Sequence, residues 1–420
     1  MRGNWQARAR QNLDTVMGKM AAGDYNTEQP GAINAVIRAE IPHAGFVYEK
    51  AVGRAYANSA VPMTTEHQFH IASVAKPMTA TVILQLWEEG ALGSNGLDAN
   101  LAELGVFDEA IVERLHMIDG VSFGQQVTLR HLLTHTSGFK ESVGDDAGGT
   151  AKDYGHPAPN SYLARYQAGI QAHLDCLEDP DCDLDELVTR KNWNMWDPSR
   201  PDDPEAGVVN WFLATGTSAA ALWPPGQQFY YSDTGYVVLG LVAEQLTGKD
   251  LHRLWRERIF DPLGMEKSYL AYATDPYPDP WIHDVADFFL GEIGGVTSKF
   301  NISFDRGGGG VVSTVGDLNR YLMGLMRGEL FKRPETLVTM TQWRYFPGIK
   351  APRVGVGLGI FGEGTEHNTV LVGHSGAYGT KMYFEPETGL YFSGTVNQRL
   401  GVPYYWWHEA VRAIHKASDH

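Results

Sequence analysis

Residues 69–77 read FHIASVAKP, and this stretch carries the clearest chemical signal in the chain of 420 residues. Ser73 and Lys76 are three positions apart, so on a helix they share a face and the hydroxyl can meet the amine. Pro77 predicts that this helix begins close to Ser73, because a proline deeper inside a helix removes a hydrogen bond and clashes with the preceding turn. At a helix start, free backbone N–H groups and the helix dipole favour an alkoxide or an oxyanion, and a neutral Lys76 is able to take the serine proton.

Two more motifs stand farther along the chain. Residues 231–233 read Tyr-Ser-Asp and lead directly into a predicted helix at 235–246, although the same pattern fits a tyrosine beside an aspartate that caps the helix. Residues 374–376 read His-Ser-Gly and stand between two predicted strands, where a glycine lets a substrate lie against the strand backbone. An ordinary turn at a strand end is the alternative interpretation of this second motif.

Further stretches accompany these motifs in a fixed order. They are VTLRHLLTHTSG at 127–138, IFDPLGM at 259–265, GGGVVST at 308–314 and GHSG at 373–376. Together with the first motifs, they make the sequence resemble the serine β-lactamase-like and penicillin-binding-protein-like hydrolases over roughly residues 30 to 400. That group includes class C β-lactamases, D-aminopeptidases, D-amino-acid amidases and family VIII carboxylesterases.

The resemblance implies a fold, a mechanism and a set of site residues. The fold is α+β, with an antiparallel sheet and flanking helices built from both termini and a mainly helical domain inserted between them. Ser73 attacks a carbonyl, Lys76 and Tyr231 share the proton transfer, and the backbone N–H groups of Ser73 and Ala377 form the oxyanion hole. Whether Lys76 or Tyr231 is the acylation base stays open. Neither a cofactor nor a metal is implied. The expected substrate-binding residues are Asp233, His374, Ser375 and Gly376.

Two positions depart from the pattern of many relatives. Asp233 stands where an asparagine is common, so a carboxylate near Lys76 would favour the charged lysine and shift proton work toward Tyr231. Alternatively, Asp233 receives a cationic group of the substrate, such as a free amine. His374 replaces a lysine and is mostly neutral at pH 7, so a substrate carboxylate loses its fixed cation. This second departure favours esters, amides and other substrates without a free carboxylate.

Periodicity and composition predict the remaining architecture. Helices are expected at residues 4–22, 77–89, 235–246, 251–259, 315–326 and 404–417, and strands at 32–37, 44–51, 354–361, 369–372, 378–384 and 390–396. A glycine run at 306–310 is expected to be flexible. The pattern predicts a sheet domain from residues 1–76 and 296–420 and a helical domain from 77–295, elaborated at 140–225. The groove between the domains is the expected site.

The composition limits the partners and the compartment. Lys and Arg number 34 against 50 Asp and Glu, and this formal net charge of −16 argues against nucleic acid or an anionic membrane surface. No run approaches the roughly 18 to 20 apolar residues of a membrane-spanning helix. We therefore expect a soluble chain, either cytoplasmic or exported after a signal was removed. Cys176 and Cys182 form either a local disulfide or two ordinary thiols. The oligomeric state stays open.

Several other patterns have plain structural explanations. Trp193, Trp196, Trp211 and Trp223 either line an aromatic acyl pocket or hold the long 140–225 segment together. Asp179, Asp181, Asp183 and Asp185 alternate like calcium ligands, but Pro180 and the missing glycine break the EF-hand pattern, so no metal is expected. His131 and His135 lack the zinc-peptidase pattern and are expected as core residues or as supports of the site. The chain has no Gly-x-Ser-x-Gly elbow, which argues against an α/β-hydrolase.

These observations favour a serine hydrolase that works through an acyl-enzyme on small esters or amides, of the carboxylesterase or D-amino-acid amidase and aminopeptidase type. A β-lactamase or D-alanyl-D-alanine carboxypeptidase is the first alternative. A non-catalytic protein that binds ligands on the same fold is the second. The sequence does not name the substrate, because acyl specificity would lie in the 140–225 segment, whose shape cannot be derived from its pattern.

Overall fold

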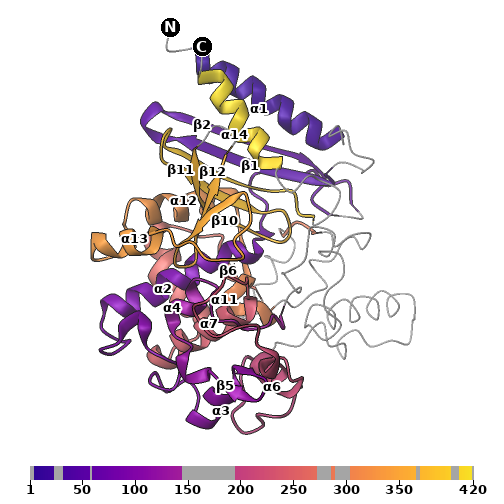
Figure 1. Ribbon diagram of the computed structural model, residues 1–420. Coiled ribbons are helices and arrows are strands. Elements are labelled where there is room, and N and C mark those ends of the chain that lie inside the picture. The colour runs from indigo at the N-terminus through magenta and orange to yellow at the C-terminus, as the bar shows by residue number, and fades with distance from the viewer. Residues whose placement is uncertain are drawn as a thin grey trace, which may run out of the picture.

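An antiparallel sheet built from both ends of the chain organises the computed structural model (Figure 1), which describes residues 4–22, 32–56, 59–143, 194–271, 285–288, 303–365, 369–398 and 406–418. In order across the sheet, its strands are β2 (Phe46–Gly53), β1 (Asn34–Ile41), β12 (Leu390–Thr395), β11 (Lys381–Glu385), β10 (Val370–Ser375), β9 (Phe361–Gly364) and β8 (Arg353–Val356). Every neighbouring pair is antiparallel. The ends of the chain meet where β1 pairs with β12, with Val36 opposite Thr395.

Helices cover both faces of this sheet. The first and last helices, α1 (Asn4–Ala22) and α14 (Trp406–Ser418), lie side by side on one face, where Figure 1 shows them crossing the outer side of β1 and β2. Tyr383 of β11 stacks on Trp407 of α14, with ring centroids 4.2 Å apart. On the other face lies α12 (Val315–Met326), whose Val315 carbonyl accepts a hydrogen bond from Ser393 of β12. Apolar residues alternate across the sheet and feed a core on each side.

The helical part centres on α2 (Lys76–Glu88) and α7 (Asp233–Thr247), which pack against each other. A small sheet consists of β3 (Phe69–His70), β7 (Val311–Ser313) and β6 (Tyr269–Leu270), in that order. The chain passes from β3 through a short turn into α2. The other described elements are α3 (Glu109–Arg114), β4 (Met117–Ile118), β5 (Val121–Ser122), α4 (Leu129–Leu133), α6 (Val208–Ala214), α8 (Leu251–Trp255), a π-helical turn (Arg256–Phe260), α9 (Asp261–Leu263), α11 (Arg306–Gly309) and α13 (Pro334–Thr341). The helix α2 is buried on nearly every side, and its residues are accordingly apolar apart from a few whose polar side chains are hydrogen-bonded.

The predicted elements are confirmed in most places and wrong in two. The helices at 4–22 and 315–326 have the predicted bounds, and the other predicted helices and strands, except the strand at 354–361, are found with shifted ends. The strand expected at 354–361 is instead two strands, β8 and β9, because Gly359 turns the chain at a φ of +75° and lies against α2. A Cβ on Gly359 would come within 2.5 Å of the Ala80 side chain, so only glycine fits this turn. The glycine run is also ordered, since residues 306–309 form α11.

Part of the elaborated segment lies outside the described residues. Cys176, Cys182, Trp193 and the acidic run at 179–185 fall there. Trp196 and Trp211 pack against the main core, and the Trp223 indole donates to the Gln228 carbonyl, which supports packing as their role. The domain boundaries stay predictions.

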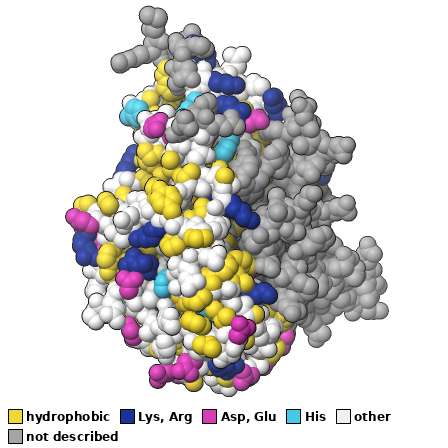
Figure 2. All heavy atoms as spheres, in the orientation of Figure 1, with side chains coloured by type: hydrophobic (Ala, Val, Ile, Leu, Met, Phe, Trp, Pro, Cys, Tyr) yellow, Lys and Arg dark blue, Asp and Glu magenta, His cyan; other side chains and the backbone are white. Residues whose placement is uncertain are grey.

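The surface and the helix lengths bear on possible partners. On the face seen in Figure 2, the described Lys and Arg side chains lie among acidic ones rather than in one continuous area. Within the described ranges, no helix is both long and apolar enough to cross a membrane.

Candidate active site

Ser73 stands at the start of a helix, as Pro77 predicts. The chain leaves β3 at His70, makes a 3₁₀ turn over Ala72–Ala75 and continues as α2 from Lys76. From Gln68 to Leu84, Ser73 is the one residue that is not buried. Ala72 holds a left-handed φ of +48°, which costs an alanine roughly 1–2 kcal/mol. Strain of this kind persists where the surrounding packing fixes it, and here it turns the following serine outward.

Lys76 is fully buried, and its ammonium has three acceptors. Nζ donates to Ser73 Oγ at 3.0 Å, to the carbonyl of Gly308 at 2.7 Å and to Asp233 Oδ1. Burial is the largest single influence and lowers the pKa of Lys76, but the charges of Asp233, Tyr231 and Asp305 and the hydrogen bond to Asp233 together outweigh it, so the pKa rises above its ordinary value. Lys76 is therefore charged in this arrangement, with all three N–H bonds engaged.

Tyr231 brings a buried hydroxyl to the same place. Its ring centroid lies 4.9 Å from Lys76 Nζ, and its hydroxyl is near enough to Lys76 and Ser73 to be influenced by both, although it is buried without a hydrogen-bond partner among the described residues. Burial raises the pKa of Tyr231, while the nearby charge of Lys76 lowers it by less. The ring stacks on His135 at 4.2 Å, and His135 Nδ1 accepts the N–H of Ser232 at 3.1 Å. His135 thus supports Tyr231, in agreement with its prediction as a supporting residue.

Asp233 occupies the first turn of α7 without capping it. The cap is Ser232, whose Oγ accepts the N–H of Gly235 at 3.2 Å, so the interpretation of Asp233 as the helix cap is wrong. The side chain of Asp233 is free to reach Lys76 and keeps 18% of its surface exposed. Of the two options raised for this residue, the pairing with Lys76 is the one present in the structure.

Glu141 fixes the start of α7, and the sequence analysis missed it. This buried carboxylate accepts the N–H of Asp233 at 2.5 Å and that of Thr234 at 3.3 Å, together with the N–H groups of Ser142 and Val143. The Thr234 hydroxyl also donates to it at 3.1 Å. A carboxylate is favoured at this helix N-terminus by the exposed N–H groups and the dipole. Glu141 stands three positions after the end of the 127–138 stretch, and this proximity to a motif was its only sequence signal.

In the His374 motif, the side chains of His374 and Ser375 lie on opposite faces of the sheet. The His374 Nδ1–H donates to the carbonyl of Ser375 at 2.8 Å, and burial, then the charge of Lys76, holds its pKa well below the ordinary value. The neutral ring lies beside Tyr231, with centroids 6.1 Å apart. The Ser375 hydroxyl instead hydrogen-bonds with Tyr383 at 2.6 Å, on the face covered by α1 and α14. The side chain of Ser375 is therefore not brought to the site.

Gly376 and Ala377 form the turn after β10. A Cβ on Gly376 would lie 2.3 Å from the carbonyl oxygen of Ile71 and 3.3 Å from the Ala72 side chain. Close approach to the Ser73 turn, rather than space for a substrate, thus explains this glycine. In this turn Gly376 and Gly379 donate backbone hydrogen bonds, whereas the exposed Ala377 N–H makes none with a described residue. The geometry is compatible with the predicted oxyanion hole, which stays a prediction.

Two ionisable residues near the site were missed. The Arg353 guanidinium lies 4.1 Å from the Phe361 ring centroid and 5.7 Å from that of Tyr231. Asp305 lies near Lys76 and is partly exposed as a residue, although its Oδ1 is buried; desolvation, then the charge of Asp233, raises its pKa well above the ordinary value. Neither residue belongs to a stretch that carries the resemblance, although Asp305 directly precedes the glycine run.

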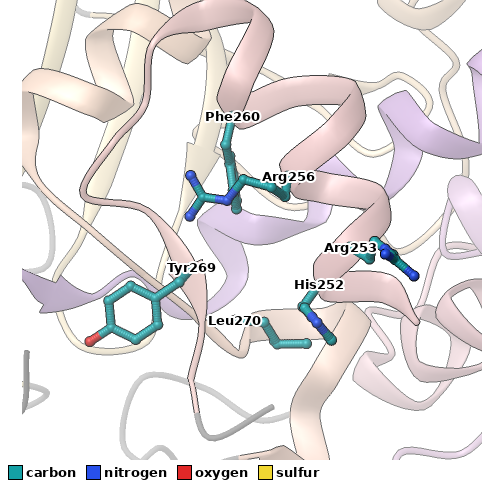
Figure 3. Close-up of a pocket in the computed structure, with 6 residues that line it drawn as sticks. All are labelled: His252, Arg253, Arg256, Phe260, Tyr269 and Leu270. Carbon is teal, nitrogen blue, oxygen red and sulfur yellow. The ribbon is translucent and has the colours of Figure 1, made fainter. Parts of the chain in front are cut away.

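A pocket of about 170 Å³ opens elsewhere, between the helical segment 251–260 and β6 (Figure 3). Its lining residues are His252, Arg253, Arg256, Phe260, Tyr269 and Leu270. None of them belongs to the Ser73 site. Among the described residues, no group of three or more His, Cys, Asp or Glu side chains is arranged to hold a metal ion.

The sheet, the flanking helices and the serine at the start of α2 define a β-lactamase/transpeptidase-like fold. The chain belongs to the Beta-lactamase family, whose family model matches residues 24–405. It is 28% identical over 389 residues to the esterase EstB of Burkholderia gladioli, a match covering 86% of this chain and 84% of the esterase.

Solved structures show the same fold at low identity. A D-stereospecific amidohydrolase from Streptomyces sp. superposes with a TM-score of 0.66 at 20% identity, covering 95% of this chain and 97% of that one. The D-amino acid amidase of Ochrobactrum anthropi SV3 superposes with a TM-score of 0.65 at 19% identity, covering 99% of both chains.

Proposed function

We propose that the protein is a serine hydrolase that acts on small esters or amides through a covalent acyl-enzyme on Ser73. The observation that carries the proposal is the 3.0 Å contact between the buried Lys76 Nζ and the Ser73 Oγ, with the Tyr231 hydroxyl beside both. The family supports it as well, because one relative is named an esterase and one structural neighbour a D-amino acid amidase.

The proton route follows from the contacts of Lys76. As an ammonium, Lys76 has no lone pair for the serine proton, and it donates to Ser73. When one proton moves along the existing hydrogen bond to the Asp233 carboxylate, Lys76 becomes an amine and the bond to Ser73 reverses. The Ser73 proton then passes to Nζ as Oγ attacks the carbonyl. In this proposal the acylation base is Lys76, enabled by Asp233.

Tyr231 serves the leaving group in the same cycle. Its raised pKa keeps the hydroxyl protonated, so Tyr231 is a donor at rest. It gives its proton to the departing alcohol or amine and is restored by Lys76, which holds the proton taken from Ser73. The N–H groups of Ser73 and Ala377 are proposed to stabilise the oxyanion.

His374 sets the substrate class in this proposal. The neutral ring supplies no fixed cation for a substrate carboxylate, which favours esters and amides over β-lactams and D-alanyl peptides. Asp233 is engaged by Lys76, so recognition of a free substrate amine is the weaker of its two proposed roles. The substitution Asp233→Asn should alter the ratio of ester to amide turnover if it also contacts substrate, and should lower both rates equally if it serves Lys76 alone.

The test is covalent labelling and turnover. A fluorophosphonate should form an adduct on Ser73 that mass spectrometry locates, and chromogenic esters should be hydrolysed. Turnover that survives Ser73→Ala would refute the proposal, as would a labelled residue other than Ser73. A parallel screen with D-amino-acid amides and nitrocefin separates the amidase and β-lactamase alternatives, and loss of turnover in Lys76→Ala eliminates a purely ligand-binding role.

A further inference from the structure

Two positions of the glycine run before β7 are restricted to glycine by the close approach of an acidic side chain, that of Asp305. A Cβ on Gly308 would lie 2.1 Å from Asp305 Oδ1, and a Cβ on Gly309 would lie 2.2 Å from Asp305 Oδ2. Real Cβ atoms do not approach other atoms so closely, so both positions require glycine. The carboxyl of Asp305 occupies the space that two side chains would otherwise fill.

The same glycines bring Asp305 to the nucleophile turn. Gly308 also touches Lys76, because its carbonyl accepts from Nζ at 2.7 Å and its Cβ would lie 3.5 Å from Nζ. A Cβ on Gly309 would lie 3.1 Å from the carbonyl carbon of Ala72. The Asp305 carboxyl therefore lies between the glycine run and the segment that carries Ser73 and Lys76, with its Oδ1 buried.

Asp305 is not accounted for by helix capping. It precedes α11, yet its side chain caps none of the N–H groups there. Its Oδ1 is buried without a hydrogen-bond partner among the described residues. An unpartnered buried carboxylate oxygen is costly when charged, which favours the protonated acid.

The ionisable groups that interact electrostatically with Asp305 come from several elements. They are Lys76 of α2, Asp233 of α7, Glu141 of the segment after α4 and Tyr378 of the turn after β10. Lys76 is the one cation among these described groups and already pairs with Asp233. Burial, then the charge of Asp233, raises the pKa of Asp305 well above the ordinary value, while Lys76 opposes this. This direction favours the protonated form of Asp305.

We propose that Asp305 is a positioning residue that controls the proton of Lys76 from the buried side of the site, an inference that rests on the proposed function. While Asp305 is neutral, Lys76 faces one carboxylate, Asp233, and can pass a proton to it. Once Asp305 loses its proton to solvent, Lys76 faces two carboxylates and is held as an ammonium. The lone pair that Ser73 needs is then missing, and acylation falls as the pH rises through the titration of Asp305.

The experiment compares pH profiles of kcat/KM for the wild-type protein and Asp305→Asn on one chromogenic ester. Asparagine keeps the shape of the neutral acid but has no proton to lose in this range. The wild-type rate should fall about tenfold per pH unit on the alkaline side, as expected for one titrating group. Each protein's kcat/KM is expressed as a fraction of its own maximum. At the most alkaline pH measured, this fraction should be at least about tenfold larger for Asp305→Asn than for the wild type. Asp317→Asn is the matched control, because Asp317 is buried but has its own hydrogen-bond donors in Lys267, Ser268 and Arg320.

The outcomes separate this inference from the proposed function. An alkaline fall in Asp305→Asn that matches the wild type and the control overturns the role of Asp305 and leaves the function standing. Absence of turnover and of Ser73 labelling in the wild type overturns both. If Asp305→Asn does not fold, infrared spectroscopy of the wild type decides: a protonated carboxyl must disappear over the same pH range in which acylation falls, and a fall without that loss overturns the inference.

Discussion

Replacement of Lys76 by methionine tests the buried ion pair at the centre of the site. The substitution keeps a long apolar side chain but leaves the Asp233 carboxylate and the Gly308 carbonyl without their donor. Removal of one partner from a buried pair costs about 3–5 kcal/mol. Because Asp233 keeps 18% of its side-chain surface in solvent, we expect the lower end, about 3 kcal/mol in the free energy of unfolding.

Urea denaturation of four proteins measures this energy. The double variant Lys76→Met with Asp233→Asn replaces the stranded carboxylate by a neutral amide and should recover about 2 kcal/mol relative to Lys76→Met alone. Lys267→Met is the control, since Lys267 pairs with Glu66 on an exposed surface and its loss should cost at most about 1 kcal/mol. A double variant no more stable than Lys76→Met would refute the ion-pair reasoning.

Three further predictions follow from individual contacts. Tyr231→Phe keeps the stacking on His135 but should lower kcat on a chromogenic ester by about 10²- to 10⁴-fold, with little change in KM. An unchanged kcat would show that Tyr231 takes no part in the proton transfer. Glu141→Gln replaces one acceptor oxygen by an amide NH2 group that cannot accept the N–H bonds it faces, so it should cost about 1–3 kcal/mol and lower kcat. A wild-type thermal midpoint would contradict this role. Burial lowers the pKa of Lys381 to about 7 in the folded protein, against roughly 10.4 in an unfolded chain. Between these two pH values the unfolded state therefore binds more protons than the folded state. The free energy of unfolding should rise with pH across that window. Lys381→Met should flatten this rise in urea denaturation at several pH values, and an unchanged slope would assign it to another group.

Local sequence rules predicted much of the fold and the first part of the site. Ser73 and Lys76 are three positions apart, and one turn of a helix brings such residues together. Pro77 marks where that helix begins, so the contact and the helix start can both be predicted from one short stretch. Helices such as 315–326 carry a strong periodic pattern and have the predicted bounds. Propensity and period are local properties, and they are reliable where no distant segment intervenes.

The errors arose where distant segments intervene. Gly359 makes a turn because α2 approaches it, and the resulting split between β8 and β9 has no signature in the apolar run at 354–361. The glycine run at 306–310 is ordered because Asp305 and the Ala72 turn fill the space its missing side chains leave. A glycine-rich pattern alone favours flexibility, and tertiary packing reverses that expectation.

The same cause explains why the sequence left the acylation base open. The choice between Lys76 and Tyr231 depends on how many carboxyls surround one ammonium in a buried space, and not on either residue alone. Those carboxyls come from chain segments 157 positions away at Asp233 and farther still at Asp305, beside the glycine whose carbonyl Lys76 also contacts. Only the folded chain brings them together, and there burial favours the protonated form of Asp305 while Asp233 pairs with Lys76. The motif therefore predicts the nucleophile, whereas the protonation of its partner is a property of the tertiary structure.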